Sequence, residues 1–451
     1  MNQRKRVWSL LLAVLLLLSA CQKSDPAPKE DTVSEKQEEE QKEEEIPLEP
    51  VESFDPSSYA NAMMLEDYDF FWTTLEENCA PLENIQQARH VDLQQLKEEF
   101  RARVEAIPDG EGETFFRIME ELSGKFQNFA HIQIVDSIVY HRYLDGGTWE
   151  SDTQKELFSA PLVQAFYNWA GSLPGVEEEL EQVQETETVE EDSDYASNIL
   201  FSREGDTAIA TVKTFLFYGE ESLEQVIESL QNFCLENMDA QNFIIDITGN
   251  GGGNGAVWAD GFAPLWAGKT FTHEVIAAYK SGEVNQQMWD GWPENDREVE
   301  LREFSEITPE EFPQLDPAIR SSCAGIAIKT VTDDYSQEEN PDGSRFEGRI
   351  WILTDKANAS SAEDLVLFAK GNPFCTLVGT ATGGGGGWMA SPVNVDAAMP
   401  HCGMLFRFHP FYFINEDGAS NDTNGTTPDI EIESGETAMQ RCLKEIKKLQ
   451  K

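Results

Sequence analysis

The stretch FIIDITGNGGGNGAVWADG, residues 243–261, decides the fold, because a short apolar run there leads straight into a glycine-rich loop. Such a run of β-branched and aromatic residues is typical of a central strand in a parallel sheet. Three consecutive glycines, Gly251 to Gly253, cost backbone entropy, so the loop needs bare main-chain amides or a conformation closed to other residues. The loop also follows the carboxyl end of a strand, where open α/β sheets place their ligands.

The segments around this loop alternate between strand-like and helix-like patterns. The strand-like runs are rich in β-branched residues, and the helix-like segments carry apolar residues three and four positions apart. In chain order, strands and helices are expected at 207–217, 222–238, 242–248, 348–355, 361–371, 375–387, 427–433 and 436–451. The order strand–helix–strand occurs twice, which predicts an α/β fold of mixed α+β composition built on βαβ units.

The whole chain of 451 residues is predicted to divide into five parts. Its first residues are basic and continue into an apolar run that ends in Leu-Ser-Ala-Cys, which resembles a bacterial lipoprotein signal with Cys21 as the lipidated residue. The segment that follows contains EKQEEEQKEEE and almost no aromatic residues, which predicts a disordered tether. The five parts are a signal peptide at 1–20, an acidic tether at 21–57, a helical domain at 58–135, a connecting segment with an acidic insertion at 136–200, and the α/β core at 201–451.

Charge and cysteine spacing exclude several classes of function. The net charge of −50, from 83 acidic and 33 basic residues, excludes nucleic acid as a partner and leaves the lipid anchor as the expected membrane contact. The six cysteines after Cys21 are widely spaced and form no metal-binding pairs, so we expect no metal and at most two disulfides. A second glycine-rich loop, TATGGGGG at 380–387, lies at the carboxyl end of another predicted strand. Neither glycine-rich loop matches a phosphate-binding fingerprint, and no cofactor is expected. The predicted location is extracytoplasmic, and the oligomeric state stays open.

A second stretch, TDKANASSAEDL at 354–365, places two serines between a strand and a helix. One interpretation is structural: a serine caps the helix, and Glu363 completes a capping box. The other interpretation is catalytic: one serine is a nucleophile, and amides at the helix start and in the glycine loop stabilise its oxyanion. The residue types of this stretch leave both interpretations open.

Taken in order, the segments DITGNGGG, TDKANASSAEDL, LVGTATGGG and TPDIEI resemble the C-terminal-processing (tail-specific) serine peptidase family over about residues 205 to 440. The resemblance implies a crotonase-like or ClpP-like peptidase core and a nucleophile at Ser360. It also implies an oxyanion hole formed by the amide of Ser361 and an amide of Gly252, with Gly253 beside it. No metal or cofactor takes part in the implied reaction.

The general base departs from the usual pattern of that family. The processing branch carries a lysine in the second glycine-rich loop, where Gly385 stands in this chain. The tricorn-core-like branch uses a histidine at the end of the helical region, and His131 occupies that place. Phe129 stands where that branch usually carries an aspartate. We therefore expect His131 to be the base, with His409 in reserve.

A histidine base needs an acceptor on its other ring nitrogen. The resemblance places that acid at Asp422, shortly before the PDI element, with Glu416 and Asp417 as alternatives. The chain is therefore expected to be a lipid-anchored extracytoplasmic serine endopeptidase that cleaves peptides or unfolded protein. The rival expectation is a catalytically inactive relative that binds peptides or a cell-envelope partner, and Gly385 and Phe129 favour it.

Overall fold

The computed structural model describes residues 53–127, 129–146, 151–174, 176, 198–217, 220–291, 298–387 and 394–449. The predicted signal peptide, the predicted lipidation site Cys21 and almost all of the predicted tether lie outside the described residues. Residues Pro50–Lys451 form one compact unit. Among the helices of the described ranges, none is long and apolar enough to cross a membrane.

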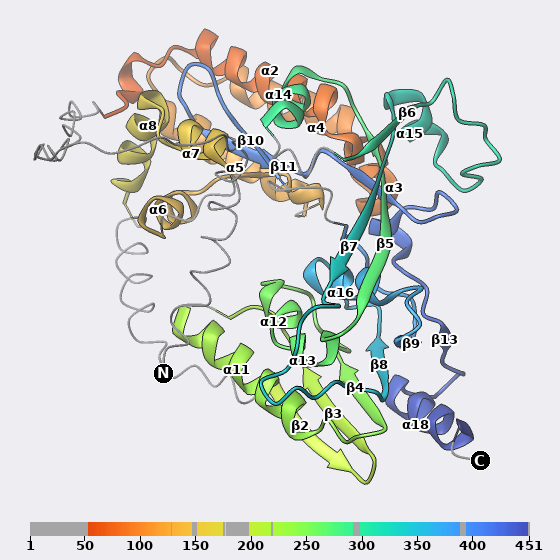
Figure 1. Ribbon diagram of the computed structural model, residues 1–451. Coiled ribbons are helices and arrows are strands. Elements are labelled where there is room, and N and C mark those ends of the chain that lie inside the picture. The colour runs from red at the N-terminus through yellow and green to blue at the C-terminus, as the bar shows by residue number, and fades with distance from the viewer. Residues whose placement is uncertain are drawn as a thin grey trace, which may run out of the picture. The chain divides into compact units, whose positions relative to one another are not determined.

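A six-stranded sheet forms the centre of the α/β core (Figure 1). Its order is β13-β9-β8-β4-β3-β2, and β2 is antiparallel to β3 while the other five strands are parallel. The strands are β2 (Ile199–Glu204), β3 (Thr207–Val212), β4 (Asn242–Asp246), β8 (Arg349–Thr354), β9 (Cys375–Gly379) and β13 (Ile430–Glu431). Helix α11 (Glu220–Glu236) connects β3 to β4, and α16 (Ser361–Ala369) connects β8 to β9. The predicted mixed α/β fold with two βαβ units is confirmed.

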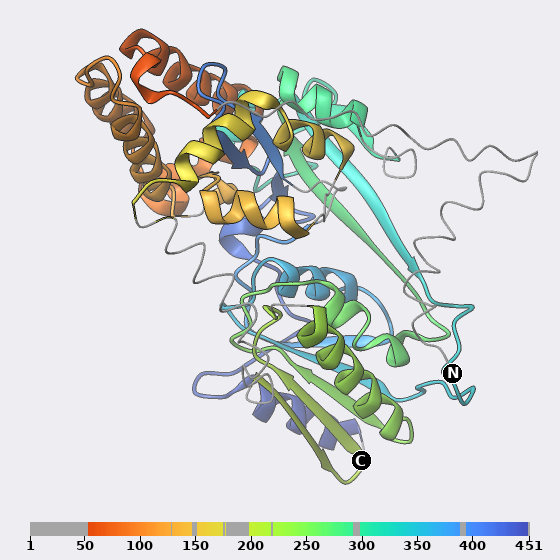
Figure 2. The ribbon, with the colours of Figure 1, turned by 90° about the vertical axis from the view of Figure 1, so that its left-hand side faces the viewer.

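Helices cover both faces of this sheet, which explains why its central strands are continuously apolar. Alternate residues of a strand point to opposite faces. Ile245 and Ile352 therefore pack in one core with α11 and α16, whereas Ile244 and Leu353 pack in a second core with the closing helix α18 (Ala438–Leu449). Figure 2 shows α11 and α18 on opposite sides of the strands. The arrangement leaves the strand ends, where the glycine-rich loops begin, free to form a site.

A second region combines helices with a small sheet and has its own large hydrophobic core. Its helices are η3 (Pro56–Ser58), α2 (Asn61–Asn78), η4 (Ala80–Asn84), α3 (Ile85–Arg89), α4 (Leu93–Glu105), α5 (Gly112–Lys125), η5 (Phe129–His131), α6 (Ser137–Gly146), α7 (Asp152–Phe158) and α8 (Pro161–Gly171). The sheet has the order β1-β11-β10, with β1 (Gln133–Ile134) and β10 (Val395–Ala398) both antiparallel to β11 (Leu405–Phe408). Helices thus continue through residue 171, well into the segment that we expected to be a connection.

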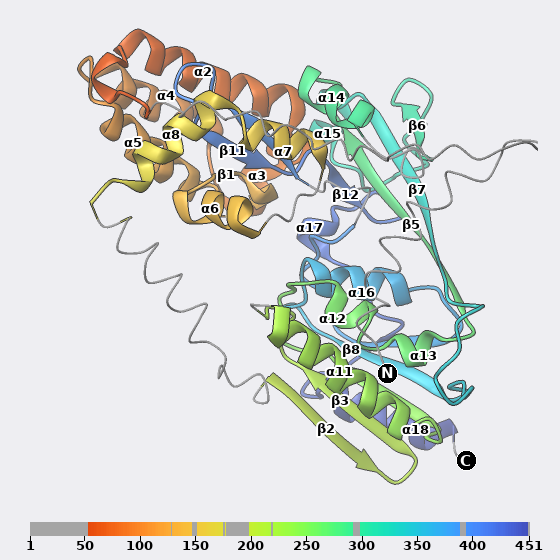
Figure 3. The same ribbon diagram turned by 60° about the vertical axis from the view of Figure 1, so that its left-hand side comes forward.

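An antiparallel ribbon links the two regions (Figure 3). Strands β5 (Thr270–Tyr279) and β7 (Gly325–Asp334) pair over their full length in a sheet of order β12-β5-β7-β6, with β6 (Glu300–Glu303) and β12 (Tyr412–Ile414). Phe271, near one end of β5, packs in the core beside the six-stranded sheet, and Ala277, near the other end, packs in the core of the helical region. The remaining helices are α12 (Ala256–Ala259), α13 (Ala263–Trp266), α14 (Glu283–Gly291), α15 (Pro317–Ser322) and α17 (Asn421–Asn424).

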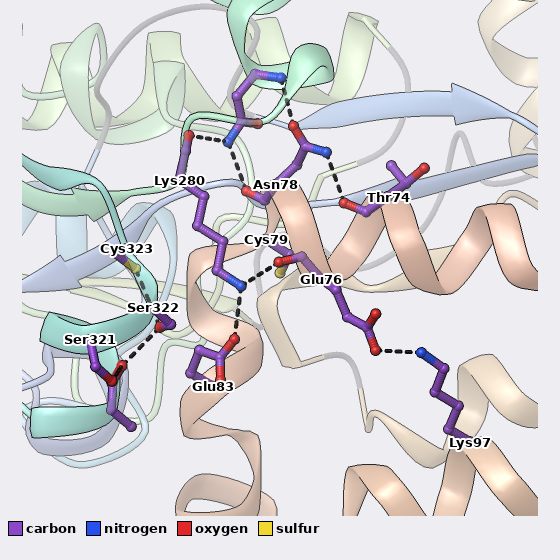
Figure 4. A network of polar contacts seen from close by, with 12 residues as sticks. Thr74, Glu76, Asn78, Cys79, Glu83, Lys97, Lys280, Ser321, Ser322 and Cys323 are labelled. Carbon is purple, nitrogen blue, oxygen red and sulfur yellow. Dashed lines mark hydrogen bonds and ion pairs between the residues drawn. The ribbon is translucent and has the colours of Figure 1, made fainter.

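Polar contacts fasten the helical region to the end of this ribbon (Figure 4). Lys280, the residue after β5, is buried and donates from Nζ to Glu76 O at 2.7 Å and to Glu83 Oε1 at 2.9 Å. Asn78 Oδ1 accepts from the Asn285 N–H at 3.0 Å, and Asn285 Nδ2 donates to Asn78 O at 2.8 Å. Because a buried polar group is costly to leave unpaired, these contacts hold α2 and η4 in place against β5.

Candidate active site

A cavity of about 250 Å³ brings together segments that are far apart in the sequence. Its lining residues are Pro81, Arg89, Phe129, Ala130, His131, Gly251, Ala359, Ser360, Gly383, Gly384, Gly385, His409, Phe411, Phe413 and Asp422. They come from both glycine-rich loops, from the turn before α16, and from the helical region with its small sheet. The three residues predicted to be catalytic, Ser360, His131 and Asp422, therefore line one cavity, together with the reserve base His409.

Ser360 occupies the turn between β8 and α16 in a strained backbone conformation. Its φ of 54° and ψ of −131° lie in a region that costs a non-glycine residue about 1–3 kcal/mol. The turn is pinned, because the Ser360 N–H donates to Gly384 O at 3.2 Å and Ala359 forms a β-bridge with Gly384. The Ser360 side chain makes no capping hydrogen bond to α16, which removes the helix-cap interpretation for this serine. A sharp, strained strand-to-helix turn of this kind presents the nucleophile in other hydrolases.

The first glycine-rich loop lies directly against that turn. Gly252 and Gly253 have φ values of +102° and +137°. A Cβ atom on Gly252 would lie 2.6 Å from Ala359 O and 2.9 Å from Ser360 Cβ, and one on Gly253 would lie 2.2 Å from the carbonyl carbon of Phe215. Only residues without side chains fit these two positions, so close backbone approach explains Gly252 and Gly253.

The amides predicted for the oxyanion hole differ in availability. The Gly252 N–H donates to Asn250 Oδ1 at 2.8 Å, and Asn250 is itself buried and donates from Nδ2 to Val212 O at 3.0 Å. The N–H groups of Gly253 and Ser361 have no hydrogen-bond acceptor in the described part of the chain. A Cβ atom on Gly252 would lie 3.1 Å from the Ser361 nitrogen, which places this loop beside the start of α16. The amide of Ser361, the residue after Ser360, and the amide of Gly253, the residue after Gly252, are thus free to receive an oxyanion.

His131 lies at the end of η5 on another strained segment. His131 and Ala130 have φ values of 51° and 50°, and the His409 N–H donates to Ala130 O at 2.7 Å, which ties this segment to the end of β11. Burial lowers the pKa of His131 below 6.5, the Asn394 side chain acts in the opposite direction, and the charge of Arg407 lowers the pKa further. His131 is therefore neutral near pH 7, as a general base must be. Its Nδ1 atom is buried and has no partner among the described residues.

His409, the predicted reserve base, is a poorer candidate. Its ring centroid lies 6.1 Å from that of His131, and its Nδ1 contacts the Phe411 backbone, with Nδ1 3.1 Å from Phe411 O and 3.2 Å from Phe411 N. Burial, reinforced by His131, lowers the pKa of His409 to about 3. A group with so low a pKa is a weak proton acceptor.

Asp422 lies in the short helix α17, on the side of the cavity that holds the second glycine-rich loop. Burial raises the pKa of Asp422 to about 6, the charge of Arg89 opposes this rise, and Glu363 adds to it. A Cβ atom on Gly385, the position where the sequence resemblance would place a lysine base, would lie 3.5 Å from Asp422 Oδ1. In the described part of the structure no hydrogen bond joins Asp422 to His131. The predicted alternatives Glu416 and Asp417 are exposed and do not line the cavity.

Glu363 has a role that the sequence did not reveal. The capping-box interpretation is wrong, because this side chain is wholly buried and Oε1 accepts from Asn421 Nδ2 at 2.9 Å and from Thr426 Oγ1 at 2.5 Å. Burial raises its pKa. Glu363 thereby ties α16, which begins next to Ser360, to the segment that carries Asp422. An acidic residue inside the apolar run SAEDLVLF is the one signal that could have indicated a buried role.

Several solved structures are similar to this chain at low sequence identity. No curated protein matches the chain. A lipoprotein from Streptococcus agalactiae is similar with a TM-score of 0.44 at 14% identity, over 86% of this chain and 96% of that one. Mature CPAF in complex with lactacystin is similar with a TM-score of 0.43 at 13% identity, over 86% and 97%. The photosystem II D1 C-terminal processing protease is similar with a TM-score of 0.39 at 10% identity, over 82% and 93%.

A match to a family model covers five strands of the six-stranded sheet, all except β2, together with the ribbon and both glycine-rich loops. The model is that of peptidase family S41, and it matches residues 206–432, which are 227 of the 451 residues. The match includes Ser360, Asp422 and the oxyanion-hole candidates, whereas His131 precedes it. It confirms the expected kinship with the C-terminal-processing peptidases. The chain belongs to peptidase family S41, a family of serine peptidases.

Proposed function

We propose that this peptidase is a serine endopeptidase in which Ser360 is the nucleophile and His131 is the general base. The observation that carries the proposal is the uncapped, strained turn at Ser360, which lines one cavity with a neutral histidine and lies beside two unpaired amides. The substrates are peptides or unfolded protein, since an extended chain can reach a cavity that lies between two regions of the molecule. No cofactor is required by this chemistry.

In the proposed reaction, Ser360 Oγ attacks the carbonyl carbon of the substrate while its proton passes to His131 Nε2. The N–H groups of Gly253 and Ser361 stabilise the resulting oxyanion, and Gly252 provides the close approach of the loop. His131 then gives the proton to the leaving amine, and an acyl-enzyme remains. A water molecule, deprotonated by His131, hydrolyses the ester and restores Ser360. Asp422, a carboxylate lining the same cavity, stabilises the imidazolium through its charge.

A second candidate function is an inactive peptidase fold that binds peptides. One observation favours it: within the described residues, Ser360 and His131 are not hydrogen bonded, and His131 Nδ1 is unpaired. Such bonds are often long or open in unliganded active sites and close when substrate binds. The two candidates differ in one property, because only an activated serine reacts with a phosphonate.

Covalent labelling of the full-length protein with a fluorophosphonate tests the proposal. We expect label on Ser360, located by peptide mass mapping, and its loss in Ser360→Ala and in His131→Ala. Ser202→Ala and His401→Ala are the matched controls, because both residues lie outside the cavity and both variants should label like the wild type. Absence of label from the folded protein between pH 6 and 9 would favour the peptide-binding candidate. Label lost only in Ser360→Ala would exclude His131 as the base.

We also propose that Cys21 carries a lipid that holds the peptidase on the outer side of the cytoplasmic membrane. The support is the order of basic residues, apolar run and Leu-Ser-Ala-Cys at the start of the sequence. In the producing bacterium, the wild type should sediment with membranes and incorporate labelled palmitate, while Cys21→Ser should do neither. A wild type that carries no palmitate would overturn the proposal.

A further inference from the structure

Two buried polar atoms near the cavity lack partners, and one hydrogen bond would satisfy both. They are Nδ1 of His131 and Oδ1 of Asn394, neither of which has a hydrogen-bond partner among the described residues. A ring nitrogen can donate and an amide oxygen can only accept, so their chemistry is complementary. Native proteins rarely leave such groups unpaired, and each exception calls for an explanation.

The small sheet brings the segments that carry these two side chains to the same end of β11. Gln133 of β1 and Asp396 of β10 are both register partners of Arg407 in the central strand β11. His131 precedes Gln133 by two residues, and Asn394 precedes Asp396 by two residues. His131 lies in η5 and Asn394 directly before β10, so the segments that carry these two residues flank β11 at the end where His409 follows it.

Electrostatics supports the same pairing. The Asn394 side chain raises the pKa of His131, against the lowering by burial and by Arg407. Arg407 is itself paired with Asp396, with Nε 2.7 Å from Oδ1 and Nη2 2.8 Å from Oδ2. His409, the third titratable group facing His131, stays neutral because burial lowers its pKa to about 3. Asp396 is thus already engaged, and among these neighbours Asn394 is the free acceptor.

We propose that Asn394 is a positioning residue of the active site, whose Oδ1 accepts a hydrogen bond from the Nδ1–H of His131. This inference rests on the proposed role of His131 as the base. The bond would hold the imidazole in the tautomer that keeps the Nε2 lone pair available to the Ser360 proton. Asp422 then acts on the imidazolium by charge alone. The base would be oriented by a neutral amide, with no carboxylate bound to its ring.

The test is nitrogen NMR of the imidazole groups in ¹⁵N-histidine-labelled full-length protein, with the His131 signal identified from His131→Ala. We expect the wild type to show the Nδ1–H tautomer at His131 above its pKa. Asn394→Ala should lose that preference, lower the pKa of His131 and reduce kcat by about tenfold or more. Asn394→Asp should keep the tautomer and raise the pKa, because it places a negative charge on the acceptor. Opposite shifts in the two variants are a readout that general damage to the fold would not produce.

Asn340→Ala is the matched control, since it removes a buried asparagine that bonds to Pro264 O and Ser344 O, in a loop that does not line the cavity. It should leave the tautomer and the pKa of His131 unchanged. The inference is overturned if Asn394→Ala leaves both unchanged, or if Asp422→Asn rather than Asn394→Ala abolishes the Nδ1–H tautomer. The NMR readout does not require turnover and can be repeated in Ser360→Ala. A missing phosphonate label therefore argues against the proposed function, and an unchanged tautomer argues against Asn394.

Discussion

Ser360 and His131 line the same cavity, but the halves of the molecule that hold them are built differently. The Ser360 half is a parallel sheet with a hydrophobic core on each face. The His131 half is a set of helices around a small antiparallel sheet, with one large core. Both residues sit at positive φ, at 54° and 51°, so backbone strain is common to the two halves.

The difference lies in how completely each position is supported. The turn at Ser360 is clamped by Gly384 from one glycine-rich loop and touched by Gly252 from the other, both within the same sheet region. The segment that carries His131 is held to β11 by the Ala130 carbonyl and by the pairing of β1, and Nδ1 of His131 has no partner in the described structure. The nucleophile is thus preorganised by local contacts, while the base depends on contacts between strands of the small sheet. The Ser360 half therefore fixes its functional residue by contacts within one region, whereas the His131 half needs a further hydrogen bond to fix the imidazole.

The largest effect on the Ser360 half is expected from Gly252→Ala. A new Cβ would lie 2.6 Å from Ala359 O and push the loop away from the nucleophile, and a misplacement of about 1 Å costs on the order of 10²-fold in rate. Steady-state kinetics on a peptide substrate would measure the fall in kcat/KM. Gly249→Ala is the control, because its φ of +87° is similar but no atom lies within 4 Å of the new Cβ. If kcat/KM falls equally in both variants, the loss is due to backbone strain at a positive φ and not to the close approach of the loop to Ser360.

A smaller effect, on stability, is expected from Glu363→Ala. The substitution leaves Asn421 Nδ2 and Thr426 Oγ1 without their shared acceptor in a buried place, which should lower the free energy of unfolding by about 2–4 kcal/mol. Urea unfolding monitored by circular dichroism would measure it. Glu363→Gln keeps an acceptor oxygen, so its free energy of unfolding should fall clearly less than that of Glu363→Ala. If Glu363→Ala is no less stable than Glu66→Ala, a change at an exposed residue, the tie between α16 and α17 does not contribute.

The smallest effect is expected in the pH dependence of kcat/KM, whose acidic limb can be due either to His131 or to Asp422. Burial lowers the pKa of His131 below 6.5, and a base acts when deprotonated, so kcat/KM should stay high below pH 6.5 before it falls. Asp422, whose pKa burial raises to about 6, could also produce an acidic limb, because its carboxylate must be ionised. Asp422→Asn tells them apart: a limb due to His131 moves to lower pH when the nearby charge is lost, whereas a limb due to Asp422 disappears.

Much of the Ser360 half could be predicted from the sequence. The strands β4 and β8 and the helix α16 have local patterns that agree with their final structure, and two glycine-rich loops at strand ends indicate a site. The ribbon of β5 and β7 was not predicted, because its residues alternate only weakly and one strand passes through two different cores. Strands β10 and β11 of the small sheet were not predicted either, because each has only four residues.

Some residues of the site could likewise be found from the sequence, and others only from the structure. The sequence alone determined the mixed α/β fold, the family and the position of Ser360 in a turn before a helix, because these depend on local patterns within single segments. Only the tertiary structure decided that Glu363 is a buried link, that the Gly252 amide is engaged by Asn250, and that Nδ1 of His131 is buried without a partner among the described residues. These facts depend on which distant segments pack together, and strand register and side-chain burial between segments leave no periodic trace in the sequence.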